Sequence, residues 1–95
     1  MFATIMADEI QEIGDRLKAT REALQKTQAS WCRMVGIEQQ AWNNYERGRR
    51  RISLDHALKV VKATGVGLDW IYRGIAKDLP QDIFNGLRQL ERGRR

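Results

Sequence analysis

The sequence predicts an all-α protein, because apolar residues recur every three or four positions and no alternating run is long enough for a strand. A chain of 95 residues forms one domain with a modest core. The clearest break in the pattern lies between Gly74 and the only proline, Pro80. We therefore expect an N-terminal extension over residues 1–8, a domain over residues 9–74 and a C-terminal tail over residues 75–95.

The first two helices are predicted from apolar periodicity and from capping residues. The first covers about Glu9 to Gln25, where charged positions separate the apolar ones as on a helix packed on one side. Thr27 can cap a second helix through its hydroxyl, and Gly36 can end that helix. The second helix has a short apolar face made of Trp31, Met34 and Val35.

Further helices are predicted in the second half of the chain. Ser53 can serve as an N-cap, and an apolar stripe runs from it to Gly65. A shorter apolar helix covers Leu68 to Tyr72. Behind Pro80 an additional C-terminal helix is expected, although Gly86 weakens it, with a stripe made of Ile83, Phe84, Leu87 and Leu90.

The segment GIEQQAWNNYERGRRR, Gly36 to Arg51, carries a more specific pattern. On a helical wheel it separates into two faces. The inward face contains Ile37, Ala41, Trp42 and Tyr45, and the outward face contains Gln39, Gln40, Asn43, Asn44 and Arg47. Glutamine and asparagine amides carry a donor beside an acceptor, which suits them to bond N6 and N7 of adenine in the major groove. An exposed helix face is polar in any case, so the amides alone leave an ordinary solvated face open.

The charge distribution and the order of the elements favour DNA binding. The formal net charge is +5, and arginines crowd the exit of the third helix whereas acidic residues open the chain. Positive charge attracts polyanions, so double-stranded DNA is the expected partner. A short helix, a single-glycine turn, a second short helix and a basic exit follow one another as in a helix-turn-helix.

From about Ile10 to Gly74 the chain resembles the Cro/CI bacteriophage repressor-like (XRE-type) family of helix-turn-helix DNA-binding domains. The matching features are Thr27-Gln28, Gly36-Ile37, Trp42, Tyr45 and Glu46-Arg47-Gly48. The resemblance implies a five-helix lambda-repressor-like fold, to which the tail adds a C-terminal helix. The sequence departs from the family pattern at Glu38, where serine or threonine commonly caps the third helix. It departs again at Trp42, which replaces a β-branched aliphatic residue.

The same resemblance implies roles for individual side chains. Base reading is assigned to Gln39, Gln40, Asn43 and Asn44. Contacts to the DNA backbone are assigned to Thr27, Gln28, Arg47, Arg49, Arg50 and Arg51. Glu46 is left out of the site, with orientation of Arg47, helix capping or exposure to solvent as its alternatives. The expected function is that of a transcriptional repressor that binds a pseudo-palindromic operator as a homodimer.

The C-terminal apolar stripe has two expected uses, because it can form a dimer contact or pack on the core of its own domain. The dimer contact is favoured, with Trp70, Ile71, Tyr72, Ile83, Phe84 and Leu87 as its residues. The alternative function is that of an antitoxin, whose tail binds a partner toxin and which binds DNA to regulate its own synthesis.

Catalytic and membrane functions have little support in the composition. Cys32 and His56 are the only residues of their types, and no pattern of carboxylates accompanies them. We therefore expect no enzyme activity, no metal and no cofactor. The single cysteine fits a reducing cytoplasm, and the opening MFATIMA is too short to span a membrane and lacks the basic start of a signal peptide. A cytoplasmic protein without membrane association is expected.

Overall fold

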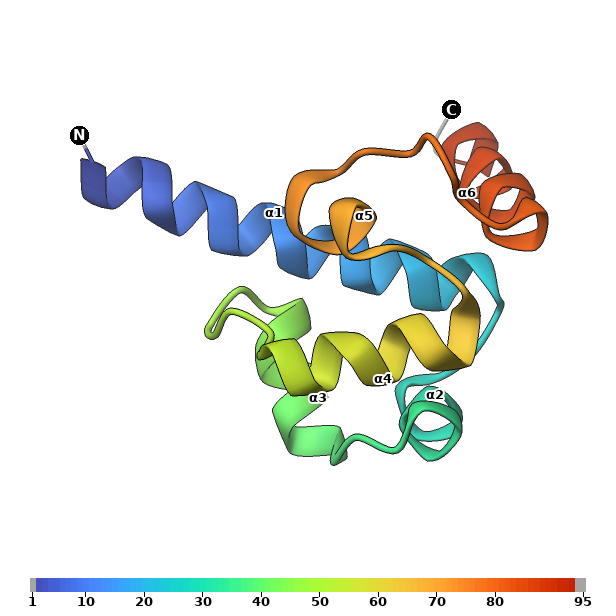
Figure 1. Cartoon of the computed structure of the whole chain (residues 1–95), viewed down its shortest axis with the longest axis horizontal. Coiled ribbons are helices and arrows are strands. Elements are labelled where there is room, and N and C mark those ends of the chain that lie inside the picture. Colours follow the sequence, from blue (N-terminus) through green and yellow to red (C-terminus); the bar gives the residue numbers. More distant parts are fainter. Residues whose placement is uncertain (1, 94–95) are drawn as a thin grey trace.

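The computed structural model describes residues 2–93, with side chains from residue 9 onward. Within this range the regular structure consists of helices only, which confirms the all-α prediction (Figure 1). Their bounds are α1 (Phe2–Ala23), α2 (Gln28–Val35), α3 (Gln39–Glu46), α4 (Leu54–Thr64), α5 (Leu68–Arg73) and α6 (Gln81–Gly93). None of these helices is both long enough and apolar enough to cross a membrane.

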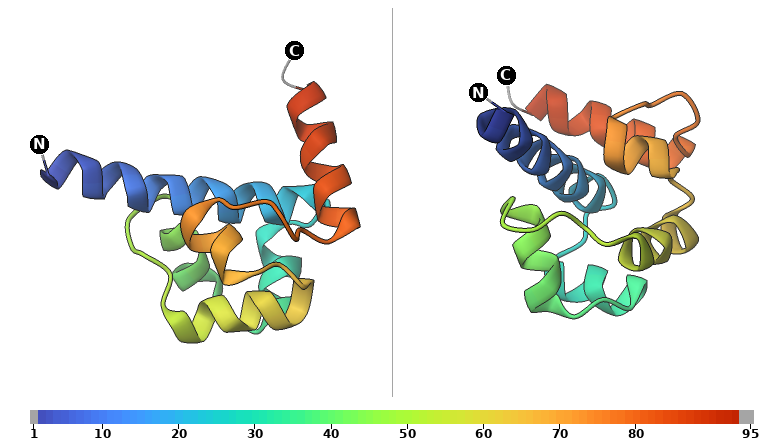
Figure 2. Two further views of the ribbon diagram at one scale, coloured as in Figure 1. Left: turned by 45° about the horizontal axis from the view of Figure 1, so that its top comes forward. Right: turned by 60° about the vertical axis from the view of Figure 1, so that its left-hand side comes forward.

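The long helix α1 runs across the molecule, with α2 and α3 on one side and α6 on the other (Figures 1 and 2). It begins at Phe2 rather than at the expected Glu9. Apolar periodicity locates only the packed part of a helix, whereas residues 2–8 contain no proline or glycine that would end it. The extension expected over residues 1–8 is therefore continuous with α1 through residues 2–8.

The core lies among α1 and the five helices that follow it, with Ile83 as the contribution of α6. Its largest members are Trp31 of α2 and Trp42 of α3, which are fully buried with ring centroids 5.3 Å apart. Trp42 also meets Tyr45 edge to face. The aromatic pair fills the space between α2 and α3, which explains how tryptophan is accommodated where an aliphatic residue is usual. The other fully buried large side chains include Ile13, Leu17, Val60, Val66, Ile71 and Ile83.

The predicted caps of α2 and α4 are present. The hydroxyls of Thr27 and Ser53 each accept a hydrogen bond from the backbone N–H three residues later, at 3.1 and 3.2 Å. Gly36 and Gly65 follow the two helices with φ of 78° and 85°, in the left-handed region that favours glycine. These four residues fix the ends of α2 and α4 through local interactions alone.

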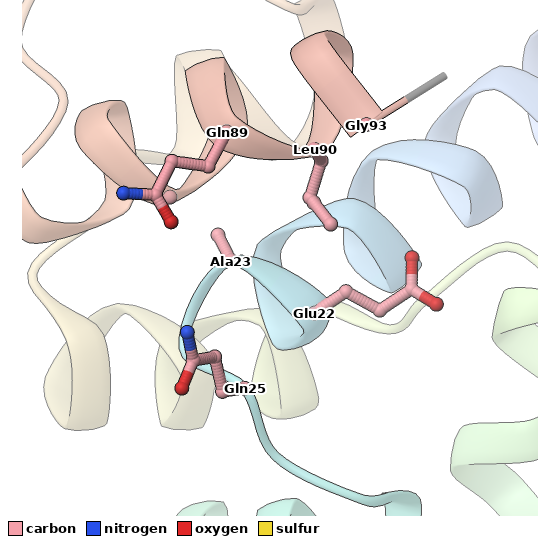
Figure 3. A pocket seen from close by; sticks show the side chains of 7 residues that line it. Glu22, Ala23, Gln25, Gln89, Leu90 and Gly93 are labelled. Atoms are coloured by element: carbon pink, nitrogen blue, oxygen red, sulfur yellow. The ribbon is translucent and has the colours of Figure 1, made fainter. Parts of the chain in front are cut away.

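The C-terminal helix α6 packs on the end of α1. At Gly86 a Cβ atom would lie 2.2 Å from the carbonyl oxygen of Ala23, so the two backbones approach as closely as glycine permits. Ile83 is fully buried there, and Leu87 packs against the same core. Beside this contact, Glu22, Gln25 and Gln89 help to line a hollow of about 390 Å³ (Figure 3). The tail therefore packs on its own domain, as the less favoured alternative stated.

The residues predicted for a dimer contact are largely used inside the domain. The prediction is wrong for Ile71 and Ile83, because both belong to the core and are only 1% and 0% exposed. Trp70 and Tyr72 are half-buried and donate hydrogen bonds to oxygen atoms of their own domain, at 2.9 and 2.8 Å. Of the six predicted residues, Phe84 alone is exposed. Helical periodicity shows that a stripe is buried, but not whether the same chain or another chain covers it.

Candidate nucleic-acid interface

The helices α2 and α3 meet at a tight turn over residues 36–38. The backbone N–H groups of Gly36 and Ile37 both donate to the carbonyl oxygen of Cys32, at 2.8 and 3.2 Å. From α4, Lys59 Nζ donates to the carbonyl oxygen of Gly36 at 2.9 Å. Cys32 is buried among the core residues that α2 and α3 share, and its small side chain occupies little space there. These contacts hold α3 against α2 in a helix-turn-helix arrangement (Figure 2).

The two faces of α3 are those that the helical wheel predicted. Trp42 and Tyr45 are buried on the inward face. The outward side chains are exposed at Gln39, Gln40 and Arg47 and half-buried at Asn43 and Asn44. The amides that were predicted to read bases therefore lie on the solvent side of the helix, and their contact with bases stays a prediction.

Glu46 is the residue whose role in positioning α3 the sequence analysis missed. It was expected to cap the helix, to orient Arg47 or to face solvent, but the structure buries it with 6% of its surface exposed. Its carboxylate accepts hydrogen bonds from Arg21 Nε and Nη2 at 2.7 and 3.0 Å, from Gln28 Nε2 at 3.1 Å and from Trp42 Nε1. The sequence indicates this burial in one way, because Glu46 lies one helical turn after Trp42 and therefore on the same inward face.

The cluster around Glu46 joins three helices beneath the outward face of α3. Arg21 comes from α1, Gln28 from α2, and Trp42 and Glu46 from α3. The side chains of Arg21 and Glu46 are only 11% and 4% exposed, and the hydrogen bond between them raises the pKa of Arg21. Removing one member of a buried ion pair costs about 3–5 kcal/mol, since the other charge stays buried without its partner. The cluster therefore sets the position of α3 relative to α1 and α2.

Two residues predicted to contact the DNA backbone have structural partners as well. The oxygen atom of Thr27 caps α2, which leaves its own hydroxyl hydrogen available as a donor. Gln28 Nε2 donates to both Asn43 Oδ1 and Glu46 Oε1, at 3.3 and 3.1 Å. Gln28 thus braces α3, and a phosphate contact through its amide hydrogens would compete with two hydrogen bonds inside the protein.

The arginines after α3 differ in how far their charge is compensated. Arg49 and Arg50 are exposed, and neither forms an ion pair with any residue that the structure describes. Arg51 Nη1 lies 3.1 Å from Glu9 Oε1 of α1, with both side chains close to half exposed. An exposed pair of this kind is worth about 0–1 kcal/mol, so Arg51 can exchange Glu9 for a phosphate at small cost.

The start of α3 lacks the usual side-chain cap. Glu38 occupies the N-cap position with φ of −59° and ψ of 137°, and its carboxylate forms no capping hydrogen bond. The departure noted at Glu38 in the sequence therefore has the expected structural effect. The N–H groups of the first turn, in which Gln39 and Gln40 stand, therefore donate no hydrogen bond to a capping side chain.

The remaining reactive side chains have structural roles. Burial raises the pKa of the Cys32 thiol, which keeps it protonated and unreactive as a nucleophile. His56 Nδ1 lies 2.7 Å from Tyr45 Oη, so the imidazole connects α4 to α3. Over the described part of the chain no group of three or more histidine, cysteine or acidic residues is placed to hold a metal ion.

Residues 17–71 match the helix-turn-helix family. This span is more than half of the chain, and the protein belongs to that family, in its Cro/CI (XRE) type. The family resemblance drawn from the turn and from the inward residues of α3 is thereby confirmed.

Two curated proteins illustrate the relationship. An uncharacterized transcriptional regulator in the ATPase CF(0) region of Rhodospirillum rubrum is 32% identical over 69 residues, which are 73% of this chain and 64% of that protein. The cryptic phage CTXphi transcriptional repressor RstR of Vibrio cholerae serotype O1 is 26% identical over 80 residues, or 84% of this chain and 71% of that repressor. The chain thus spans just under two thirds of the first relative. No solved structure matches the chain.

Proposed function

We propose that the protein is a sequence-specific regulator of transcription, which binds double-stranded DNA through α3 and acts as a repressor. The observation that carries the proposal is the outward row of amides on a helix whose opposite face is fixed by Trp42 and Glu46. Membership of the helix-turn-helix family supports it, as do relatives described as a transcriptional regulator and a phage transcriptional repressor. The proposal requires no cofactor and no catalytic residue, and it places the protein in the cytoplasm.

The dimensions of α3 suit the major groove. Its eight residues rise by about 1.5 Å each, so the helix is about 12 Å long, which is close to the width of the groove. Gln39 and Gln40 stand in the first turn, the part of a recognition helix that usually contacts base edges. Each well-formed pair of amide hydrogen bonds to adenine discriminates against other bases by about 1–3 kcal/mol.

The arginines flank this helix and supply affinity that does not depend on sequence. Arg47 is the C-cap residue of α3, and Arg49 and Arg50 follow it on an exposed loop. In the proposal they bind phosphates on the two edges of the groove, and Arg51 joins them when it leaves Glu9. Thr27 and Gln28 approach the backbone at the start of α2, where free N–H groups favour an anion.

A homodimer on an inverted repeat follows from the short length of α3. A helix of about 12 Å covers only about four base pairs at 3.4 Å each, so one copy reads a short site. Leu54 and Leu58 are one turn apart on α4 and are 56% and 46% exposed. They directly follow the arginine loop in the chain, so we propose that a second copy docks there, with both loops against the same face of the duplex. The two α3 helices would then lie about 34 Å apart.

The packing of the tail weakens the case for the antitoxin alternative. It relied on an apolar stripe that was free to bind a toxin, but Ile83 and Leu87 are used against the core of the same domain. Phe84 remains as an exposed aromatic residue, in contact with Arg88 at 5.8 Å from its ring centroid. Copurification of a second small protein that is released by Phe84→Glu would favour the antitoxin function over the one proposed.

The proposed function is tested by selecting bound duplexes from a random DNA pool and sequencing them. The expected result is an enriched inverted repeat whose half-sites are one helical turn apart. Failure to enrich any sequence would refute sequence-specific binding. Native mass spectrometry on the enriched duplex should show two copies per site, and Leu58→Glu should reduce this to one, whereas Phe84→Glu should leave two. The reverse pattern would move the dimer contact from α4 to α6.

A further inference from the structure

Glu46 determines which groups of the buried cluster donate hydrogen bonds and which accept them. Its carboxylate receives hydrogen bonds from Arg21, Gln28 and Trp42, and every one of these groups is an N–H donor. A carboxylate in such surroundings acts only as an acceptor. Glu46 therefore decides which end of its amide Gln28 must present.

Gln28 is oriented by this carboxylate. Its Nε2 lies 3.1 Å from Glu46 Oε1, and a carbonyl oxygen in that place would face another acceptor. The same nitrogen lies 3.3 Å from Asn43 Oδ1, to which it donates its second hydrogen. The amide of Gln28 cannot be reversed without breaking both hydrogen bonds.

Asn43 is oriented in turn by Gln28. Because Gln28 presents a donor, Asn43 must present its carbonyl oxygen to it, and its NH₂ group lies at the other end of the amide. Asn43 stands in the outward row of α3, one turn after Gln39, and is half-buried. It therefore offers the groove two N–H donors, while its carbonyl oxygen is engaged inside the protein.

We infer that Asn43 reads a keto base, guanine or thymine, and discriminates against the amino bases adenine and cytosine. This inference rests on the proposed function. Guanine presents N7 and O6 in the major groove and thymine presents O4, all of which accept hydrogen bonds. Cytosine presents the donor N4, which would face the donors of Asn43. Adenine also presents N7 as an acceptor, but its N6 is a donor and needs a side-chain carbonyl, which at Asn43 is held by Gln28. Adenine can therefore form only one of its two hydrogen bonds with Asn43.

The same restriction does not apply to the glutamines at the start of α3. Gln39 and Gln40 are exposed, and their side chains form no hydrogen bond with the described residues. Their amides can turn to match N6 and N7 of adenine, as the sequence analysis expected. The sequence predicted that every amide would form a pair of hydrogen bonds with adenine. At Asn43 the fold instead imposes a contact in which the side chain only donates hydrogen bonds.

The inference is tested by selecting duplexes from a random pool with the wild-type protein and with variants. Asn43→Ala identifies the contacted base pair as the one at which preference disappears. At that base pair the wild type should prefer guanine or thymine by roughly tenfold, the size of one good base contact. Asn43→Asp keeps the acceptor for Gln28 but presents a second acceptor to the groove, so the preference should reverse to adenine or cytosine.

Gln28→Met and Asn85→Asp complete the experiment. Methionine fills a similar volume without a donor, so the Asn43 amide can turn and adenine should join the accepted bases. Asn85→Asp adds the same charge at an exposed position of α6, outside the proposed interface, and should leave the preference at the Asn43 base pair unchanged. Circular dichroism checks that each variant is folded.

The outcomes separate this inference from the proposed function. A wild-type preference for adenine or cytosine at the Asn43 base pair would overturn the inference and leave DNA reading by α3 intact. An unchanged base preference in Asn43→Asp or in Gln28→Met would have the same consequence, because the hydrogen bond from Gln28 to Asn43 fixes which end of the Asn43 amide faces the groove. A wild-type protein that enriches no sequence would refute the proposed function itself.

Discussion

Replacement of Trp42 by phenylalanine should destabilise the fold much more than the same replacement at Trp31. Both indoles are fully buried, so the two changes remove similar apolar surface and leave similar cavities. They differ in the partner of one nitrogen. Trp42 Nε1 donates to the carboxylate of Glu46, whereas Trp31 Nε1 has no hydrogen-bond partner among residues 9–93.

The expected difference follows from these two nitrogen atoms. Loss of a hydrogen bond to a charged group costs about 1.5–3 kcal/mol, and at Trp42 the buried carboxylate also loses a donor. Removal of the unpaired N–H of Trp31 instead relieves a desolvation penalty of about 1–3 kcal/mol. The two variants should differ by about 3 kcal/mol in the free energy of unfolding, or by roughly 15 °C in melting temperature for a domain of this size.

Urea unfolding followed by far-UV circular dichroism measures this difference, because tryptophan fluorescence changes with the substitutions themselves. The expected order of stability is wild type, then Trp31→Phe, then Trp42→Phe. Equal losses in the two variants would refute the reasoning, since they would show that the hydrogen bond to Glu46 contributes nothing beyond burial of the ring.

Three further predictions concern α6, α3 and the buried thiol. Gly86→Ala should cost at least about 2 kcal/mol in thermal unfolding, because its Cβ would lie 2.2 Å from the carbonyl oxygen of Ala23. Gly93→Ala is the control, with open space around the new atom, and similar losses would contradict the close approach. Glu38→Ser should stabilise the fold by about 0.5–1 kcal/mol by supplying the missing cap of α3, and an unchanged melting temperature would oppose this. Burial raises the pKa of the Cys32 thiol above its ordinary 9.0, so the unfolded chain loses that proton first and the free energy of unfolding should fall as the pH rises above 9.0. Cys32→Ala should make that fall shallower, and an equally steep fall in the variant would argue against a contribution from this thiol.

Much of the fold and the two faces of α3 could be predicted because they depend on neighbouring residues. A hydroxyl at Thr27 and a glycine at Gly36 define the ends of α2 wherever the rest of the chain lies. The wheel over α3 separates buried from exposed side chains for the same reason, since only the 3.6-residue repeat is needed. The outward amides were therefore found from the sequence alone.

The cluster around Glu46 could not be predicted in the same way. Its partners Arg21 and Gln28 lie 25 and 18 positions away in the chain, so only the packing of three helices brings them together. The sequence shows that Glu46 follows Trp42 on the inward face, but it does not show that Arg21 and Gln28 supply hydrogen-bond donors there. The orientation of the Asn43 side-chain amide depends on the same hydrogen bonds, so the sequence did not predict it either.

The tail shows a second limit of sequence reasoning. The apolar spacing of α6 correctly indicated a stripe that is buried at Ile83 and half-buried at Leu87, although Phe84 is exposed. It gave no information on what covers that stripe. Gly86 looked like a weakness in that helix, whereas in the fold it permits contact with the backbone of α1. The preference for a dimer contact failed at Ile71 and Ile83 because a three-dimensional neighbour was available within the chain.

The claim that α3 reads bases while the arginines hold phosphates is tested most directly by comparing Gln39→Ala with Arg49→Ala. Each variant is titrated on the selected operator and on a scrambled duplex at several salt concentrations. Gln39→Ala should lose about 1–3 kcal/mol on the operator and almost nothing on the scrambled duplex, because an amide contact exists only with its own base. Arg49→Ala should weaken binding to both duplexes and lower the slope of log affinity against log salt by about 0.9 for each phosphate that is no longer neutralised, twice over in a dimer. If Gln39→Ala, and Gln40→Ala beside it, discriminate between the duplexes as well as the wild type does, α3 does not read bases and its amides are an ordinary solvated face.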